Sequence, residues 1–276
     1  MTFSIVARSA DGTSWGVAVA SKFLAVGSAV PAAVAGIGAI ATQALANVSY
    51  KAQALAHLDE GATAPVALQR LLDDDDGRDQ RQVGIVDLDG VAATHTGAAC
   101  LDWAGGETGD GVAIQGNILT GPEVVAAMRA SWDDGNPDAP LAERLLAALR
   151  AGDDAGGDRR GRESAALLVV SEGAGLGGFD DVQVDLRVDH HDDPVTELER
   201  LLLVHGTYFP DVPLEERVPY SPELTAELDA RARSLGHAGV LEWMGEQNLE
   251  GHGGPDWTAR VVVQRLRDAT PDWRSG

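Results

Sequence analysis

The chain has 276 residues, enough for one large domain or for a domain of about 200 residues with a small one beside it. Its 43 acidic against 21 basic residues give a formal net charge of -22, which repels phosphate backbones and anionic lipid surfaces, so we expect neither nucleic acid nor a membrane as a partner. A single cysteine, Cys100, excludes an internal disulfide framework, and without a basic and apolar leader segment we expect a cytoplasmic protein.

The first twenty residues predict a β-hairpin. Two short β-prone runs, residues 3–8 and 15–20, are separated by a turn signal. In an antiparallel pair the sum of partner numbers stays constant, so pairing the facing ends of the two runs places Thr2 beside Ser21. Lys22 follows directly, and a hydroxyl and a cation would then flank the threonine.

Thr2 is the sharpest chemical signal in the sequence. Behind a removable Met1, a threonine carries a nucleophilic hydroxyl and a general base, its own α-amine, on one residue. A neighbouring Lys22 would lower the proton affinity of these groups or stabilise developing negative charge. We predict Thr2, Ser21 and Lys22 as catalytic residues. The alternative is a threonine without a role and a lysine that protects a strand end.

Blocks of strands alternate with blocks of helices in the next 180 residues or so. Further strands are predicted at residues 36–43, 82–87, 91–94, 112–115, 165–171 and 182–188, and helices at 47–58, 64–72, 122–132, 141–150 and 194–203. Segregated antiparallel strands and helix pairs bury their apolar faces best as layers. We therefore expect an α+β fold, a four-layer αββα sandwich of antiparallel sheets. The acidic run at residues 73–76 is predicted to be a solvated loop.

The composition changes at residues 205–210, and we place a domain boundary near Gly206. The predicted domains are residues 1–205 and 206–276. Ser221 precedes a proline and an acidic first turn, which is typical of a helix start, and residues 240–249 and 257–269 predict two more helices. The second domain is therefore expected to be a small all-helical module.

Several polar residues are candidates for contacts with a substrate. Gln115 and Asn117 end a predicted strand and offer amide donors to an amide substrate or an oxyanion, although a polar turn explains them almost as well. Thr42, Gln43 and Asn47 lie between a strand and a helix, where they would line a pocket or, for Asn47, cap the helix.

Other polar clusters carry weaker signals. Asp158, predicted as a substrate-binding residue, and the arginines after it form a glycine-flanked loop that would bind a carboxylate or remain a solvated turn. The pair His190-His191 has metal-ligand residue types, but adjacent side chains rarely converge on one ion, so we predict no metal site and no cofactor. Cys100 lacks a basic partner in sequence, which makes a cysteine nucleophile a weak alternative.

Six short motifs carry a family resemblance over roughly residues 1–205. They are residues 3–8, 16–22, 41–43, 81–84, 115–117 and 155–158. Together they resemble the domain of unknown function 1028 family, which is grouped with the N-terminal-nucleophile hydrolases. The resemblance implies an αββα fold and a nucleophile at the first mature residue, here Thr2. Ser21 stands where proteasome-like members carry an aspartate.

The tail resembles a small peptidoglycan-binding-like module, on the motifs at residues 235–236, 242–243 and 246–250. From the two resemblances we expect an amidohydrolase that uses a threonine nucleophile. The alternative is a non-catalytic protein that keeps the scaffold and recognises a glycan or a protein. The expected partners are a small amide or peptide substrate and further copies of the chain as a homo-oligomer, and glycan binding by the tail is left open.

Overall fold

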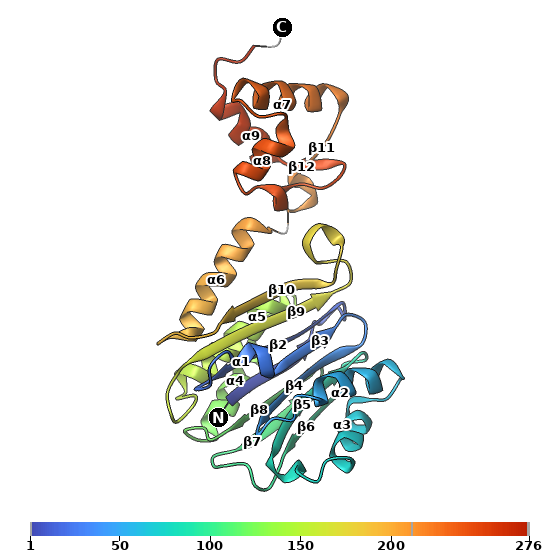
Figure 1. Ribbon diagram of the computed structural model, residues 1–276, viewed down its shortest axis with the longest axis vertical. Helices are drawn as coiled ribbons and strands as arrows, with labels where there is room; N and C mark the ends of the chain where they lie inside the picture. The colour runs from blue at the N-terminus through green and yellow to red at the C-terminus, as the bar shows by residue number, and fades with distance from the viewer. Residues whose placement is uncertain (1, 211, 275–276) are drawn as a thin grey trace. The chain divides into compact units, whose positions relative to one another are not determined.

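The computed structural model describes residues 2–210 and 212–274, and it shows a mixed α+β protein with antiparallel sheets (Figure 1). The chain divides into two compact units, Met1–Arg200 and Leu201–Gly276. Among the described residues, every helix falls short of the length and apolarity needed to cross a membrane.

The first unit contains a six-stranded sheet in which neighbouring strands are antiparallel. Its spatial order is β10 (Val182–Val188), β9 (Ser164–Ser171), β2 (Ser14–Ser21), β1 (Thr2–Arg8), β8 (Val112–Asn117) and β7 (Gly105–Gly109). The predicted hairpin is confirmed, because β1 and β2 pair Arg8 with Trp15 and Phe3 with Ala20. Strand β1 is therefore central, and its first residue lies at one end of the sheet.

A second sheet has four antiparallel strands, β3 (Pro31–Val34), β4 (Gly38–Ala44), β5 (Arg81–Asp87) and β6 (Ala92–Thr96). Strands β5 and β6, predicted at residues 82–87 and 91–94, pair as a hairpin, and Gly90 adopts the positive φ of 83° that the turn requires. Asp87 organises this turn, since its carboxylate accepts hydrogen bonds from the backbone N–H groups of Asp89 and Val91.

Two pairs of helices cover different sheets (Figure 1). Helices α2 (Tyr50–Asp59) and α3 (Ala64–Asp73) pack on the four-stranded sheet, whereas α4 (Glu123–Asp134) and α5 (Leu141–Asp154) pack on the six-stranded sheet. The remaining helical segments of this unit are α1 (Val26–Ala29), the start of α6 (Pro194–Tyr208), and the single turns η1 (Arg78–Gln80) and η2 (Leu176–Gly178).

The two sheets face each other across a core of small apolar side chains. Val6 and Val17 of the six-stranded sheet share this cluster with Ala39, Ala41 and Val86 of the other sheet. Because side chains alternate along a strand, the even-numbered residues of β1 point to this interface. Thr2 and Ser4 therefore lie on the face between the sheets.

Two strands of the first unit were not predicted from the sequence, β3 and β7. Strand β3 begins with Pro31, and β7 contains three glycines in five residues, both of which weaken a strand pattern. Both are edge strands, where a proline and glycines are tolerated because one side of the backbone needs no partner.

The second unit has its own apolar core, centred on buried side chains such as Leu228, Trp243 and Leu266. Its elements are η3 (Leu214–Glu216), β11 (Arg217–Pro219), α7 (Pro222–Ser234), α8 (Val240–Glu246), η4 (Glu250–His252), β12 (Trp257–Ala259) and α9 (Arg260–Ala269). The Ser221 hydroxyl caps α7 by accepting a hydrogen bond of 3.1 Å from the N–H of Leu224.

One expectation for this region needs correction. The module is not all-helical, because residues 257–259, predicted as helix, pair with residues 217–219 as a two-stranded sheet. The guanidinium of Arg217 stacks 4.5 Å from the ring of Trp257, and this contact favours the extended pairing over a helical turn. Helix α6 continues through Gly206, and the domain boundary near this residue stays a prediction.

Candidate functional site

Thr2 begins β1 and is buried at the interface between the sheets. Thr2 is only 6% exposed, and its Oγ1 lies 3.1 Å from the Oγ of Ser21. Ser21 ends β2 and is 2% exposed. The hairpin register therefore brings the two hydroxyls together, as the sequence predicted.

Two side-chain amides hold the backbone of Thr2. Its carbonyl oxygen accepts long hydrogen bonds from Gln43 Nε2 at 3.3 Å and from Asn117 Nδ2 at 3.4 Å. Asn117 is also the β8 partner of Thr2 in the sheet register. Gln43 comes from the other sheet, so the two sheets together fix the orientation of the first residue of β1.

Gln82 is the centre of this polar cluster, and we did not identify it as a site residue from the sequence. Its Oε1 accepts from Gln43 Nε2 and from Asn117 Nδ2, both at 2.9 Å. Its Nε2 donates to the carbonyl of Gly116 at 2.7 Å and to Thr96 Oγ1 at 2.9 Å. The sequence signal that could have identified Gln82 is a glutamine among the apolar residues of a buried strand.

A second layer of the cluster lies one pair of residues further along the strands. Ser4 Oγ donates to Gln43 Oε1 at 2.7 Å, and Gln115 Nε2 donates to Ser4 Oγ at 2.6 Å. Gln115 is fully buried, so it lies in the interior beneath Thr2 and not at an open strand end. The amide donors of the cluster bind protein acceptors. An oxyanion would have to displace one of these hydrogen bonds.

Lys22 directs its ammonium group to partners in another loop. Its Nζ lies 2.6 Å from Glu163 Oε2 and donates to the carbonyl of Arg162 at 3.0 Å. The hydrogen bonds from Lys22 and His190 hold the pKa of Glu163 below its usual range. The ammonium group therefore binds a carboxylate, and a role of Lys22 at the Thr2 hydroxyl stays a prediction.

Asp158 fastens the glycine-rich loop to the end of β2. Its carboxylate is almost completely buried and accepts hydrogen bonds from the backbone N–H of Lys22 at 2.7 Å and from that of Arg160 at 2.8 Å. The residue that it holds is directly next to Ser21. Asp158 therefore lies close in space to Ser21, although it is far away in the sequence, and it has the position of a structural support.

Thr42 and Asn47 make their hydrogen bonds outside the cluster around Thr2, and their contact with a substrate stays a prediction. Thr42 points to the opposite face of β4, since side chains alternate along a strand, and its hydroxyl donates to the carbonyl of Asn47 at 3.3 Å. Asn47 Oδ1 accepts from the N–H of Ser49, and its Nδ2 donates to Asp75. These residues build the entry to α2.

Asp75, predicted to be solvated, instead organises a second polar cluster. Its carboxylate accepts from Arg81 Nε at 2.8 Å and from the Tyr50 hydroxyl at 2.8 Å. The hydrogen bond from Arg81, with a further contribution from Tyr50, holds the pKa of Asp75 well below its usual range. Burial and the neighbouring Asp75 raise the pKa of Tyr50.

Two other candidate chemistries find no geometric support. Burial raises the pKa of the Cys100 thiol, the opposite of what a nucleophilic thiolate requires. His190 pairs with Glu163, while His191 Nδ1 accepts from the N–H of Asp193 at 3.0 Å. Within residues 2–210 and 212–274, no group of three or more His, Cys, Asp or Glu side chains could hold a metal ion.

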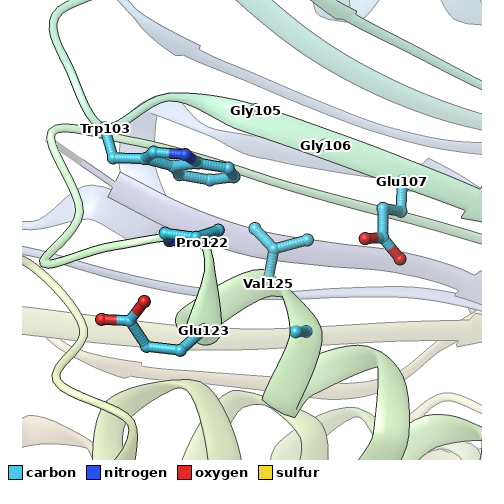
Figure 2. Close-up of a pocket in the computed structure, with 8 residues that line it drawn as sticks. Trp103, Gly105, Gly106, Glu107, Pro122, Glu123 and Val125 are labelled. Atoms are coloured by element: carbon cyan, nitrogen blue, oxygen red, sulfur yellow. The ribbon is translucent and has the colours of Figure 1, made fainter.

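Two cavities are formed by described residues of the first unit, and Thr2 lines neither of these two. One, of about 490 Å³, lies between β7 and α4, with Trp103 and Pro122 among its walls (Figure 2). The other, of about 370 Å³, is bounded by α3 and by β6 and β7 residues such as His95 and Thr108. The hydroxyl pair of Thr2 and Ser21 is therefore buried in the structure as described.

Comparison with known proteins places this geometry in a family. A family model described as "Family of unknown function (DUF1028)" matches residues 2–198. The chain is similar to the crystal structure of protein SPO2555 from Silicibacter pomeroyi, assigned to the same family model, with 32% identity over 74% of this chain and 89% of that chain and a TM-score of 0.67. No curated protein matches.

A weaker match is Anbu, the ancestral beta-subunit, from Yersinia bercovieri. It has 11% identity over 77% of this chain and 100% of that chain, with a TM-score of 0.31. This similarity is too low to support an argument.

Proposed function

The chain belongs to the DUF1028 family, and from this premise we propose that it is an N-terminal-nucleophile amidohydrolase with Thr2 as the nucleophile. The substrate class is a small amide or peptide. The observation that carries the proposal is the buried pair of hydroxyls, Thr2 Oγ1 and Ser21 Oγ, 3.1 Å apart at the first residue of a central strand. Met1, whose removal the proposal requires, lies outside the described residues.

The way in which the helices and the two sheets pack on one another supports the proposal. Helices α4 and α5 cover one sheet, α2 and α3 cover the other, and the two sheets share an apolar core. We propose that this is the four-layer αββα sandwich of the N-terminal-nucleophile hydrolases. In that arrangement a free amine on Thr2 would stand at the open end of the inter-sheet layer.

The chemistry proceeds in two steps. The Thr2 hydroxyl adds to the substrate carbonyl carbon and gives its proton to the free α-amine of the same residue, which passes it to the departing amine as the C–N bond breaks. The acyl group is then an ester on Thr2. Water, deprotonated by the same amine, attacks this ester, releases the carboxylic acid and restores the hydroxyl. Ser21 is placed to hydrogen-bond Thr2 Oγ1 in both steps.

The remaining polar residues have supporting parts in this proposal. Gln43 and Asn117 hold the Thr2 carbonyl oxygen, which orients the nucleophile. Asp158 holds the backbone next to Ser21. Lys22 is paired with Glu163 and takes no part in the proton transfers between the Thr2 hydroxyl and amine.

Intact mass and chemical trapping test the proposal together. Mature protein should lack Met1, and a β-lactone probe should add once, to the peptide that begins with Thr2. Thr2→Ala should lose labelling and amide hydrolysis while unfolding at the same urea concentration. Thr13→Ala, which removes a hydroxyl from the exposed β1–β2 turn, is the matched control and should react normally. Retained Met1 in fully active protein would reject the mechanism.

A second function is favoured by one observation: the side-chain amides near Thr2 all make hydrogen bonds within the protein, to each other and to backbone carbonyls. We propose, as the alternative, a non-catalytic protein that keeps the scaffold and binds a glycan or a protein. The second unit has a separate apolar core and strongly exposed side chains, including Leu214 at 78% and Leu241 at 72%. Binding of intact peptidoglycan by the full chain, lost in Leu241→Ser but not in Thr2→Ala, would favour this function.

A further inference from the structure

The larger cavity lies on the opposite side of the six-stranded sheet from Thr2. It is bounded by the edge strand β7 and by α4, which packs against β8, whereas Thr2 faces the four-stranded sheet. Its volume, about 490 Å³, is that of a pocket for a small organic molecule. The cavity is therefore separate from the proposed nucleophile.

The walls of this cavity are apolar. The indole of Trp103 and the ring of Pro122 face each other across it, and Val125 of α4 lies beside Pro122, on the side towards Glu107 (Figure 2). Gly105 lets the indole lie flat against β7, because a Cβ at that position would come within 2.6 Å of the Trp103 ring. The result is a slot that suits a narrow apolar chain and offers the face of an indole.

Two carboxylates lie at opposite ends of the slot, Glu107 on β7 and Glu123 at the start of α4 (Figure 2). Within the described part of the chain, neither carboxylate has a hydrogen-bond or ion-pair partner from another side chain. The cation nearby on α4, Arg129, is instead paired with Asp133 at 2.6 Å. The slot therefore presents two uncompensated negative charges with apolar surface between them.

We propose that this cavity binds an organic dication, an α,ω-diamine of the polyamine class. The two ammonium groups would lie against Glu107 and Glu123, and the methylene chain would lie between Trp103 and Pro122. An indole attracts cations through the negative face of its ring, which adds to the two carboxylates. The formal net charge of -22 raises the local concentration of polyvalent cations and speeds their association.

Calorimetric titration of the full chain with 1,4-diaminobutane and 1,5-diaminopentane tests the proposal. We expect one saturable site, with weaker binding of butylamine, which has one charge, and no binding of 1,4-butanediol. Glu107→Gln and Glu123→Gln should each weaken diamine binding about two- to fivefold, the range for an exposed charge pair. Trp103→Leu should weaken it by a similar factor.

A charge-matched variant separates this site from general attraction to an acidic protein. Glu172→Gln removes one exposed carboxylate from the β9–β10 connection and should leave diamine affinity unchanged. In NMR spectra, the indole N–H signal that Trp103→Leu removes should be the one that shifts on titration. Equal weakening by Glu172→Gln, butylamine binding as tight as diamine binding, or wild-type affinity in the Glu107→Gln/Glu123→Gln double variant would each overturn the proposal.

Discussion

The side-chain amide of Gln115 fills the space directly over Gly84 of the opposite sheet. A Cβ at position 84 would lie 2.1 Å from Gln115 Oε1, closer than any non-bonded contact allows. The same oxygen accepts a hydrogen bond from Thr94 Oγ1 at 3.3 Å. Because Gly84 of β5 has no side chain, the buried amide of Gln115 from β8 fits between the two sheets.

Gly84→Ala should destabilise the protein by about 1–3 kcal/mol, because the methyl group must push Gln115 out of its hydrogen bonds. Urea unfolding measures the change. Gly206→Ala is the control, since a Cβ there meets nothing within 4 Å and alanine favours a helix. Unchanged stability in Gly84→Ala would show that the two sheets are not packed this closely.

Gln82→Leu should cost about 1–3 kcal/mol for each buried partner that it leaves without a hydrogen bond. The partners are the amides of Gln43 and Asn117 and the carbonyl of Gly116. The free energy of unfolding again gives the measurement. Gln69→Leu, on the exposed face of α3, removes a hydrogen bond to Asp73 and should change stability by less than about 0.5 kcal/mol.

Asp75→Asn should make the free energy of unfolding less dependent on pH under acidic conditions. The pKa of Asp75 is lowered in the folded protein, so its ionised form stabilises folding above its ordinary pKa of about 4, and this contribution is lost as the pH falls below that value. At pH 7 the variant should be less stable by about 1.5–3 kcal/mol, the range for a hydrogen bond to a charged group.

The difference between wild type and Asp75→Asn should narrow as the pH is lowered from 5 towards 3. Asp76→Asn controls for the general effect of charge, because Asp76 is exposed on the same loop. Parallel stability curves for wild type and Asp75→Asn across this range would contradict the role of the carboxylate in the cluster.

Ser21→Ala tests the hydroxyl pair and rests on the proposed function. Losing the 3.1 Å contact with Thr2 Oγ1 should slow β-lactone labelling about tenfold, which corresponds to one net hydrogen bond of about 1.4 kcal/mol. Ser28→Ala is the matched control, since that hydroxyl bonds only the Ala25 carbonyl on the surface. Equal labelling rates in both variants would remove Ser21 from the mechanism.

Local patterns were sufficient for most elements and for one long-range contact. Alternation of apolar residues and the turn between residues 8 and 15 determine the first hairpin, and its register alone places Thr2 beside Ser21. The cap at Ser221 and the turn at Gly90 follow from backbone requirements that specific residue types meet. Such features depend on neighbours in the chain, which the sequence displays directly.

Only the tertiary structure decided which polar residues meet. Gln82 and Asn117 are 35 positions apart and come together because two sheets stack face to face, an arrangement that no single strand pattern encodes. Thr42 and its neighbour Gln43 point to opposite faces of β4 and therefore have different partners. Glu163, in a loop far along the chain, provides the carboxylate that binds the Lys22 ammonium group. Side chains on one strand alternate between two environments, and what fills each environment depends on elements that arrive from elsewhere.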